Sequence, residues 1–257
     1  MAGQPAFAQG FCRESLRTPP TGPCVEPAGV PLLHWTRGCF TQTFNEQVFQ
    51  RLTALDERQV RAIFHEAFAT WRDVDCGNDA PTFFVTQASG VTKTTAIEGV
   101  LDARNIGVIA APHAREWEAE GPAHGPEVVA LTSIWHDSKT GEIFDVDMEL
   151  NVDFGQFADC DRGCVGDQVD LLNTVTHEAG HLLGLGHSPN VDATMYEAAP
   201  PGQTSKRSLA RDDEHGYCAL DLPESDCEGD SSKCTCPAPP IFASRTLTRG
   251  GACAVAS

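Results

Sequence analysis

The chain has 257 residues, of which 41% are hydrophobic and 21% are charged, a balance typical of a globular protein of one or two domains. Its 18 Lys and Arg against 36 Asp and Glu give a formal net charge of −18. This charge argues against nucleic-acid binding and against docking on an anionic membrane, because both require a basic face. No apolar run approaches the roughly 18 residues of a transmembrane helix, so we expect no membrane span in this chain. We also expect a monomer.

Cysteine is frequent, with 11 residues. This density predicts a disulfide framework formed in an oxidising compartment. We therefore expect a secreted, extracellular protein. Ala6-Phe7-Ala8 has the A-x-A form that ends a secretory signal, but Met1 to Pro5 has neither the basic nor the apolar region of one. Either the leader was trimmed from this chain, or the match is chance in an Ala-rich stretch. Cys39 and Cys76 are the expected pair, because their bond would join the first strand to the end of the first helix. An odd number of thiols leaves one unpaired, and Cys253 is the candidate.

Three segments differ in composition. Residues 1–30 are irregular and contain Cys, Pro and Gly, whereas residues 222–257 form a Pro- and Cys-rich tail. Regular apolar patterns occur only between them, so we expect one ordered body over residues 31–221.

The first strong element of the body is a helix. From Val60 to Trp71, apolar residues recur at i, i+3, i+4, i+7, i+8 and i+11, which is the pattern of an amphipathic helix. Asp56 and Gln59 form a capping box at its start. Three short strands are expected around this helix, over 32–44, 82–86 and 105–110.

A hairpin follows, formed by strands at Val128–Trp135 and Phe144–Val152 across a turn-rich linker. In its second strand, apolar residues alternate with Asp145, Asp147 and Glu149. We expect the acidic face to be solvated, and calcium binding by these carboxylates is the alternative.

The chemistry concentrates in residues 177–195. His177 and His181 are four residues apart, so on a helix they lie on one face and can both bind a zinc ion. Gly184 can end the helix with a positive φ angle, after which His187 offers a third ligand. Three protein ligands leave the fourth zinc position for water. Glu178 borders this site without being a ligand and can take a proton from that water.

This segment, with Met195 eight residues after the last histidine, resembles the metzincin zinc endopeptidases. Ser188, directly after the third histidine, and Ala193-Thr194-Met195-Tyr196 are similar to the matrixins, the matrix-metalloproteinase-like group, in a secreted bacterial form. The resemblance implies hydrolysis of peptide bonds with one catalytic Zn²⁺, Glu178 as general base, and Met195 as a hydrophobic floor beneath the metal. A catalytically silent zinc-binding interaction module is the alternative function.

The resemblance also implies the fold of residues 31–221. We expect an α+β metzincin fold, with a twisted, mostly parallel five-stranded mixed sheet that has one antiparallel edge strand. Two long helices, a zinc cleft and a small C-terminal subdomain with one helix complete it. The last helix would contain Asp212 and Asp213, which either pair with the mature N-terminus or serve as first-turn acids favoured by the helix dipole.

The chain departs from the family in several places. Relatives with a second, structural zinc carry an H-x-D motif that is absent here, so His113, His124 and His136 are interpreted as loop histidines, with a second zinc as the alternative. The Gly-rich segment at Cys253 resembles the start of some bacterial C-terminal sorting signals, which makes anchoring at the cell surface through a following segment an alternative to free secretion.

The partner implied by the resemblance is a protein or peptide substrate. An extended peptide would add to the antiparallel edge strand through backbone hydrogen bonds. The pocket for the residue after the cut would be apolar, with Val175 and the segment from Tyr196 to Pro201 as its walls. The residues expected in the edge strand are Val128, Val129, Ala130, Leu131, Thr132, Ser133 and Ile134.

Overall fold

The computed structural model describes residues 10–17, 26–77, 83–93, 106–119, 123–223, 236 and 247–256. Its main sheet has six strands in the order β10-β5-β6-β4-β2-β3. Neighbours from β3 to β6 run parallel, whereas β5 is antiparallel to β6 and β10 is antiparallel to β5. The predicted mixed, mostly parallel sheet is therefore present, with one strand added. The strands are β2 (Cys39–Asn45), β3 (Phe84–Thr92), β4 (Ile106–Ala110), β5 (Val128–Asp137), β6 (Ile143–Leu150) and β10 (Leu247–Ala256).

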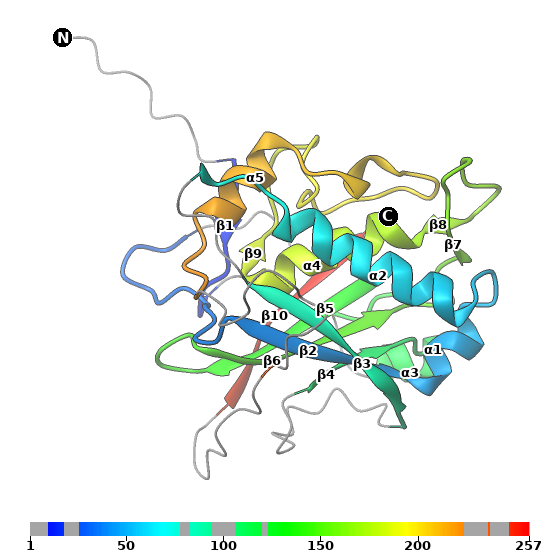
Figure 1. The fold of residues 1–257 in the computed structure, drawn as a ribbon, viewed down its shortest axis with the longest axis horizontal. Helices are drawn as coiled ribbons and strands as arrows, with labels where there is room; N and C mark the ends of the chain where they lie inside the picture. Colours follow the sequence, from blue (N-terminus) through cyan, green and yellow to red (C-terminus); the bar gives the residue numbers. More distant parts are fainter. Residues whose placement is uncertain are drawn as a thin grey trace.

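Two long helices pack against each other on one face of this sheet (Figure 1). They are α2 (Glu57–Arg72) and α4 (Leu171–Leu183). None of the helices in the described part of the chain is long and apolar enough to cross a membrane. The remaining elements are short: α1 (Glu46–Arg51), α3 (Ala114–Ala119), α5 (Arg211–Cys218), the 3-10 helix η2 (Ser205–Arg207), and the strand pairs β1 (Cys12–Arg13) with β9 (Leu185–Gly186) and β7 (Phe157–Ala158) with β8 (Val169–Asp170).

Helix α2 forms where its sequence pattern places it. The Asp56 carboxylate accepts a hydrogen bond from the Gln59 backbone N–H at 2.8 Å, and the Gln59 side chain accepts one from the Asp56 N–H at 2.9 Å. This predicted capping box satisfies two of the N–H groups that have no partner inside the helix. The apolar face of α2 is buried throughout, so hydrophobic burial stabilises the helix against the sheet and α4.

Two tryptophans fix α4 in the core. Trp71 of α2 donates its indole N–H to the carbonyl of Thr176 at 2.8 Å, and Trp35 donates to the carbonyl of Leu182 at 2.9 Å. Both rings are almost fully buried. Each therefore combines a large apolar contact area with a satisfied polar group, which leaves α4 little freedom to shift.

We predicted that Val128–Ile134 forms the edge strand of the sheet, and this prediction is wrong. These residues belong to β5, which lies between β10 and β6. Strand β10 pairs along it, from Leu247 opposite Asp137 to Ala256 opposite Val128. Unpaired backbone groups of an edge strand favour the addition of a further strand, and here the chain itself supplies that strand. Strand β10 could not be predicted, because this part of the tail is rich in Gly and has no apolar alternation.

The acidic face of β6 is buried, whereas we expected it to be solvated. Asp145, Asp147 and Glu149 are 7%, 2% and 3% exposed. Asp147 accepts hydrogen bonds from the Val108 N–H and the Trp135 indole, and Glu149 pairs with His124 at 2.8 Å. Alternation along a strand shows that its two faces differ, but it does not show what covers each face.

The predicted Cys39–Cys76 disulfide is wrong. Cys39 is bonded to Cys236, and Cys76 is bonded to Cys218. The second bond joins the ends of α2 and α5, where Trp71 and Tyr217 also pack at a ring-centroid distance of 6.1 Å. A third disulfide closes the short loop between Cys160 and Cys164. The prediction for the thiol of Cys253 lies outside what the structure describes.

Candidate metal centre

Helix α4 begins and ends as its sequence directs. Asp170 caps its first turn by accepting a hydrogen bond from the Leu172 N–H at 3.2 Å. Gly184 ends the helix at a φ angle of 110°, a conformation that glycine adopts without the steric cost of a Cβ atom. The chain then turns into β9 and brings His187 back over the helix, as predicted.

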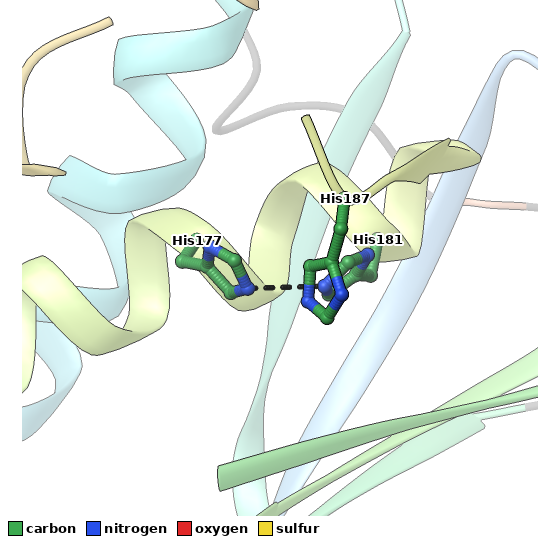
Figure 2. Close-up of side chains that lie close together, drawn as sticks. All are labelled: His177, His181 and His187. Carbon is green, nitrogen blue, oxygen red and sulfur yellow. Dashed lines mark hydrogen bonds between the residues drawn. The ribbon is translucent and has the colours of Figure 1, made fainter. Parts of the chain in front are cut away.

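The three predicted histidines converge (Figure 2). Among the described residues they form the one group of three or more His, Cys, Asp or Glu side chains that could hold a metal ion, with all ligand atoms within 4.8 Å of one another. The rings of His177 and His181 project from successive turns of α4, and His187 approaches from the following loop. All three side chains are buried.

The hydrogen bonds of two of these rings decide which nitrogen faces the site. Nδ1 of His177 lies 2.6 Å from the carbonyl oxygen of Thr194, and Nδ1 of His181 lies 2.7 Å from that of Leu185. A carbonyl can only accept a hydrogen bond, so each Nδ1 carries the proton and each Nε2 of the neutral ring presents a lone pair. Such partners typically orient metal-binding histidines.

The two Nε2 atoms face each other at 3.1 Å. Both are acceptors in this arrangement, so their contact is repulsive unless a cation lies between them. A zinc ion with Zn–N distances of about 2.0–2.1 Å reaches both atoms. Nε2 of His187 is also buried and has no hydrogen-bond partner among the described residues. The three side chains therefore fit a zinc ion.

Burial keeps the imidazoles in the form that binds metal. Loss of solvation, followed by the charge of nearby Lys206, holds the pKa of His177 well below its usual value. Burial does the same for the pKa of His181, and it lowers the pKa of His187 to about 4. The neutral rings are the ones that coordinate zinc.

Glu178 lies beside the histidines with its two carboxylate oxygens in different surroundings. Oε2 accepts a hydrogen bond of 2.5 Å from the Thr132 hydroxyl, whereas Oε1 is buried and has no hydrogen-bond partner in the described part of the chain. Burial raises the pKa of Glu178 to about 8, against the effects of the Thr132 hydrogen bond and the charge of Lys206. A cation at the histidines would lower this pKa again.

Met195 packs directly against the helix that carries the histidines. A Cβ atom added to Gly180 would lie 2.2 Å from the Met195 sulfur, so the thioether occupies the space left by the glycine. Asp213 of α5 holds this turn by accepting hydrogen bonds from the N–H groups of Thr194 at 2.7 Å and Met195 at 2.9 Å. Asp213 thus holds the methionine turn in place, which neither alternative reading of this acid included.

Lys206 of η2 is the charged residue of this region that sequence analysis missed. It is 2% exposed, its ammonium donates a hydrogen bond to the carbonyl of Tyr196, and the same nitrogen lies 3.4 Å from Nδ1 of His177. Burial lowers its pKa to about 8. Its neighbours in sequence are Ser, Thr and Arg, so nothing in the local pattern distinguished it from an exposed lysine.

The positions of the other predicted site residues do not test their predicted roles. Val175 is buried in α4 and Tyr196 is half-buried, and their role as pocket walls stays a prediction. His136 belongs to β5, not to a loop, and His124 is buried against Trp117. His113 is exposed and lies 3.2 Å from Asp153.

Comparisons with known proteins agree with this geometry. A family model described as Matrixin matches residues 34–220. Metalloendoproteinase 1 of Glycine max is 47% identical over 62 residues, which are 24% of this chain and 20% of that protein. Metalloendoproteinase 1-MMP of Arabidopsis thaliana is 50% identical over 52 residues, 20% of this chain and 14% of that protein. Matrilysin of Homo sapiens is 38% identical over 52 residues, 20% of each chain.

The matches to these curated relatives thus span one fifth or less of their length. They come from plants and from human, and they lend no support to the bacterial origin that we expected.

Proposed function

Because the chain belongs to the matrixin family, we propose that it is a zinc-dependent endopeptidase that hydrolyses peptide bonds in a protein or peptide substrate. The observation that carries the proposal is the convergence of three buried, neutral imidazoles, two of which point their Nε2 lone pairs at each other across 3.1 Å. Glu178 lies next to this group with one oxygen that no described residue binds.

A zinc ion bound by the three histidines would act as a Lewis acid on the scissile carbonyl and on the attacking water. His177 and His181 keep their rings oriented through the hydrogen bonds of their Nδ1 atoms. Glu178 accepts a proton from the attacking water at Oε1 and delivers it to the nitrogen of the leaving amine. Such proton transfer by a positioned side chain contributes about 10²–10⁴-fold to the rate.

The test compares zinc content and the rate of peptide cleavage in three variants. Glu178→Ala should keep nearly stoichiometric zinc and lose at least about 10²-fold in rate, because it removes a base and no ligand. His181→Ala should lose the metal and part of its stability, since metal binding and folding are linked. Met195→Leu should cost less than about 1.5 kcal/mol, as a hydrophobic swap of similar volume.

Two results would contradict the proposal. If Glu178→Ala lost its zinc or kept full activity, the assignment of the general base would be wrong. If the wild-type protein bound zinc but cleaved no unfolded protein, and a chelator changed nothing but its stability, the silent binding module would be the better description.

The proposal includes secretion. Disulfide bonds form and persist mainly in oxidising compartments. The bonds Cys39–Cys236 and Cys76–Cys218 join segments 197 and 142 residues apart, so the fold uses them to tie distant elements together. Anchoring at the cell surface remains the alternative to free release.

A further inference from the structure

Thr132 lies on β5, a strand of the main sheet that contacts α4. It is in the middle of β5, and Ala130, Thr132 and Ile134 point to the same side of the sheet, because side chains alternate along a strand. Ala130 and Ile134 belong to the hydrophobic core beneath the sheet, and Thr132 is fully buried between them. An uncharged but polar side chain at such a position needs a hydrogen-bond partner.

That partner is Glu178. The Thr132 hydroxyl lies 2.5 Å from Oε2 of the carboxylate and 3.3 Å from the carbonyl oxygen of the same residue. A hydroxyl has a single proton to donate, and the much shorter distance to Oε2 identifies the carboxylate as its acceptor. The bond therefore connects the sheet to the side chain of the proposed general base, across 46 positions of sequence.

We propose that Thr132 is a positioning residue, whose hydroxyl holds Oε2 of Glu178 so that Oε1 remains the oxygen available to the attacking water. This inference rests on the proposed function and assigns Thr132 a role other than the binding of substrate backbone. The hydroxyl of Thr132 is held rigidly for two reasons. Strand β5 is paired on both sides, by β6 and β10, and the β-branched threonine side chain has restricted rotation about χ1. A glutamate side chain has three rotatable bonds, so without this hydrogen bond it would populate other orientations.

The alternative is that the hydroxyl only satisfies a buried polar group and has no bearing on the reaction. A matched control separates the two roles. Thr174 of α4 is also buried, and its hydroxyl donates a 3.0 Å hydrogen bond to the Asp170 carbonyl and not to the Glu178 carboxylate. Thr174→Val and Thr132→Val therefore remove the same group at similar burial, but only the second removes a hydrogen bond to the Glu178 carboxylate.

The experiment measures kcat, KM, zinc content and unfolding for the full chain and for Thr132→Val, Thr132→Ser and Thr174→Val. Thr132→Val should lower kcat about 10- to 100-fold, because small displacements of catalytic groups are costly. Its KM should stay within about twofold and its zinc content should be unchanged, because no ligand and no uniform binding contact is lost. Thr132→Ser restores the hydroxyl and should recover most of kcat. Thr174→Val should lose stability without a selective loss of kcat.

A double-mutant cycle then tests whether the effect passes through Glu178. In a Glu178→Ala background, Thr132→Val should cause no further loss of kcat, since residues that act as a unit are not additive. An equal loss in both backgrounds would overturn the inference, and so would a wild-type kcat for Thr132→Val or an inactive Thr132→Ser that still binds zinc and folds. Those three results leave the proposed function intact, whereas a fully active Glu178→Ala would overturn both.

Discussion

The substitution Gly180→Ala tests how helix α4 packs against the turn that contains Met195. Gly180 lies in the last turn of α4, directly before His181. An added Cβ atom would lie 2.2 Å from the Met195 sulfur and 2.8 Å from Cζ2 of Trp71. Both neighbours are about 98% buried or more, and the indole is held by its hydrogen bond to Thr176, so neither can move aside freely.

Two effects of opposite sign decide the outcome. Replacing Gly by Ala in a helix interior gains about 1 kcal/mol of helix propensity. Forcing extra volume into a close-packed core typically costs about 1–3 kcal/mol, and the two short contacts point to the upper end of that range. We therefore expect a net loss of about 2 kcal/mol in the free energy of unfolding, or about 4–8 °C in the melting temperature of a protein of this size.

Thermal and urea unfolding of the zinc-loaded protein measure this loss, and zinc affinity should fall with it because His177 and His181 flank the displaced turn. Gly90→Ala is the control, since a Cβ atom added to Gly90 would have no neighbouring atom within 4 Å and the residue has no left-handed backbone angle. In a Met195→Ala background, Gly180→Ala should cost less, because part of the clash is gone. A Gly180→Ala protein that was as stable as wild type would refute the packing argument.

Two further predictions concern buried polar groups. Tyr217→Phe should be as stable as wild type or more stable at pH 7, because the buried hydroxyl has no partner among the described residues. Burial raises the pKa of Tyr217 to about 12, so the tyrosine of the unfolded chain ionises at a lower pH than that of the folded protein. The free energy of unfolding of wild type, but not of Tyr217→Phe, should therefore fall by about 2–3 kcal/mol between pH 10 and 12. If urea unfolding showed the same loss of stability for both proteins between pH 7 and 11, this reasoning would be wrong. Arg207→Ala should cost about 2–4 kcal/mol, because it leaves the fully buried carboxylate of Asp170 without its ion pair. Arg207→Lys should recover little of this stability, since lysine lacks the planar guanidinium that binds a carboxylate through two parallel hydrogen bonds. The prediction would be wrong if the free energy of unfolding of Arg207→Ala were within about 0.5 kcal/mol of wild type, which is typical of a surface substitution without coupled partners.

Much of the candidate site could be predicted because its determinants lie within a few residues of one another. The spacing of His177 and His181 places both rings on one face of any helix. The glycine at 184 permits the left-handed angle that returns the chain toward His187. The capping box at Asp56 likewise depends on a partner three residues away. Local backbone geometry decides all of these features, so sequence spacing is sufficient to recognise them.

Other features depend on partners that sequence spacing does not identify. The hydrogen bond from Thr132 to Glu178 spans 46 positions, and the one from the Met195 N–H to Asp213 spans 18. The predicted partner of Cys76 is wrong because the C-terminal ends of α2 and α5, which the Cys76–Cys218 bond connects, meet only in the folded protein. Lys206 likewise has an ordinary polar neighbourhood in sequence, and its burial is evident only in the fold.

By itself, the sequence predicted helices α2, α4 and α5, five strands of the main sheet, the three histidines that converge, and the family, because periodicity, capping and a spaced motif express local geometry. Only the tertiary structure decided that β10 flanks β5, that the acids of β6 are buried, and that one oxygen of Glu178 is held from the sheet. The physical reason is the same in each case. Side-chain alternation and residue type specify which groups require burial or a hydrogen bond, but the packing of distant segments decides which group meets that requirement.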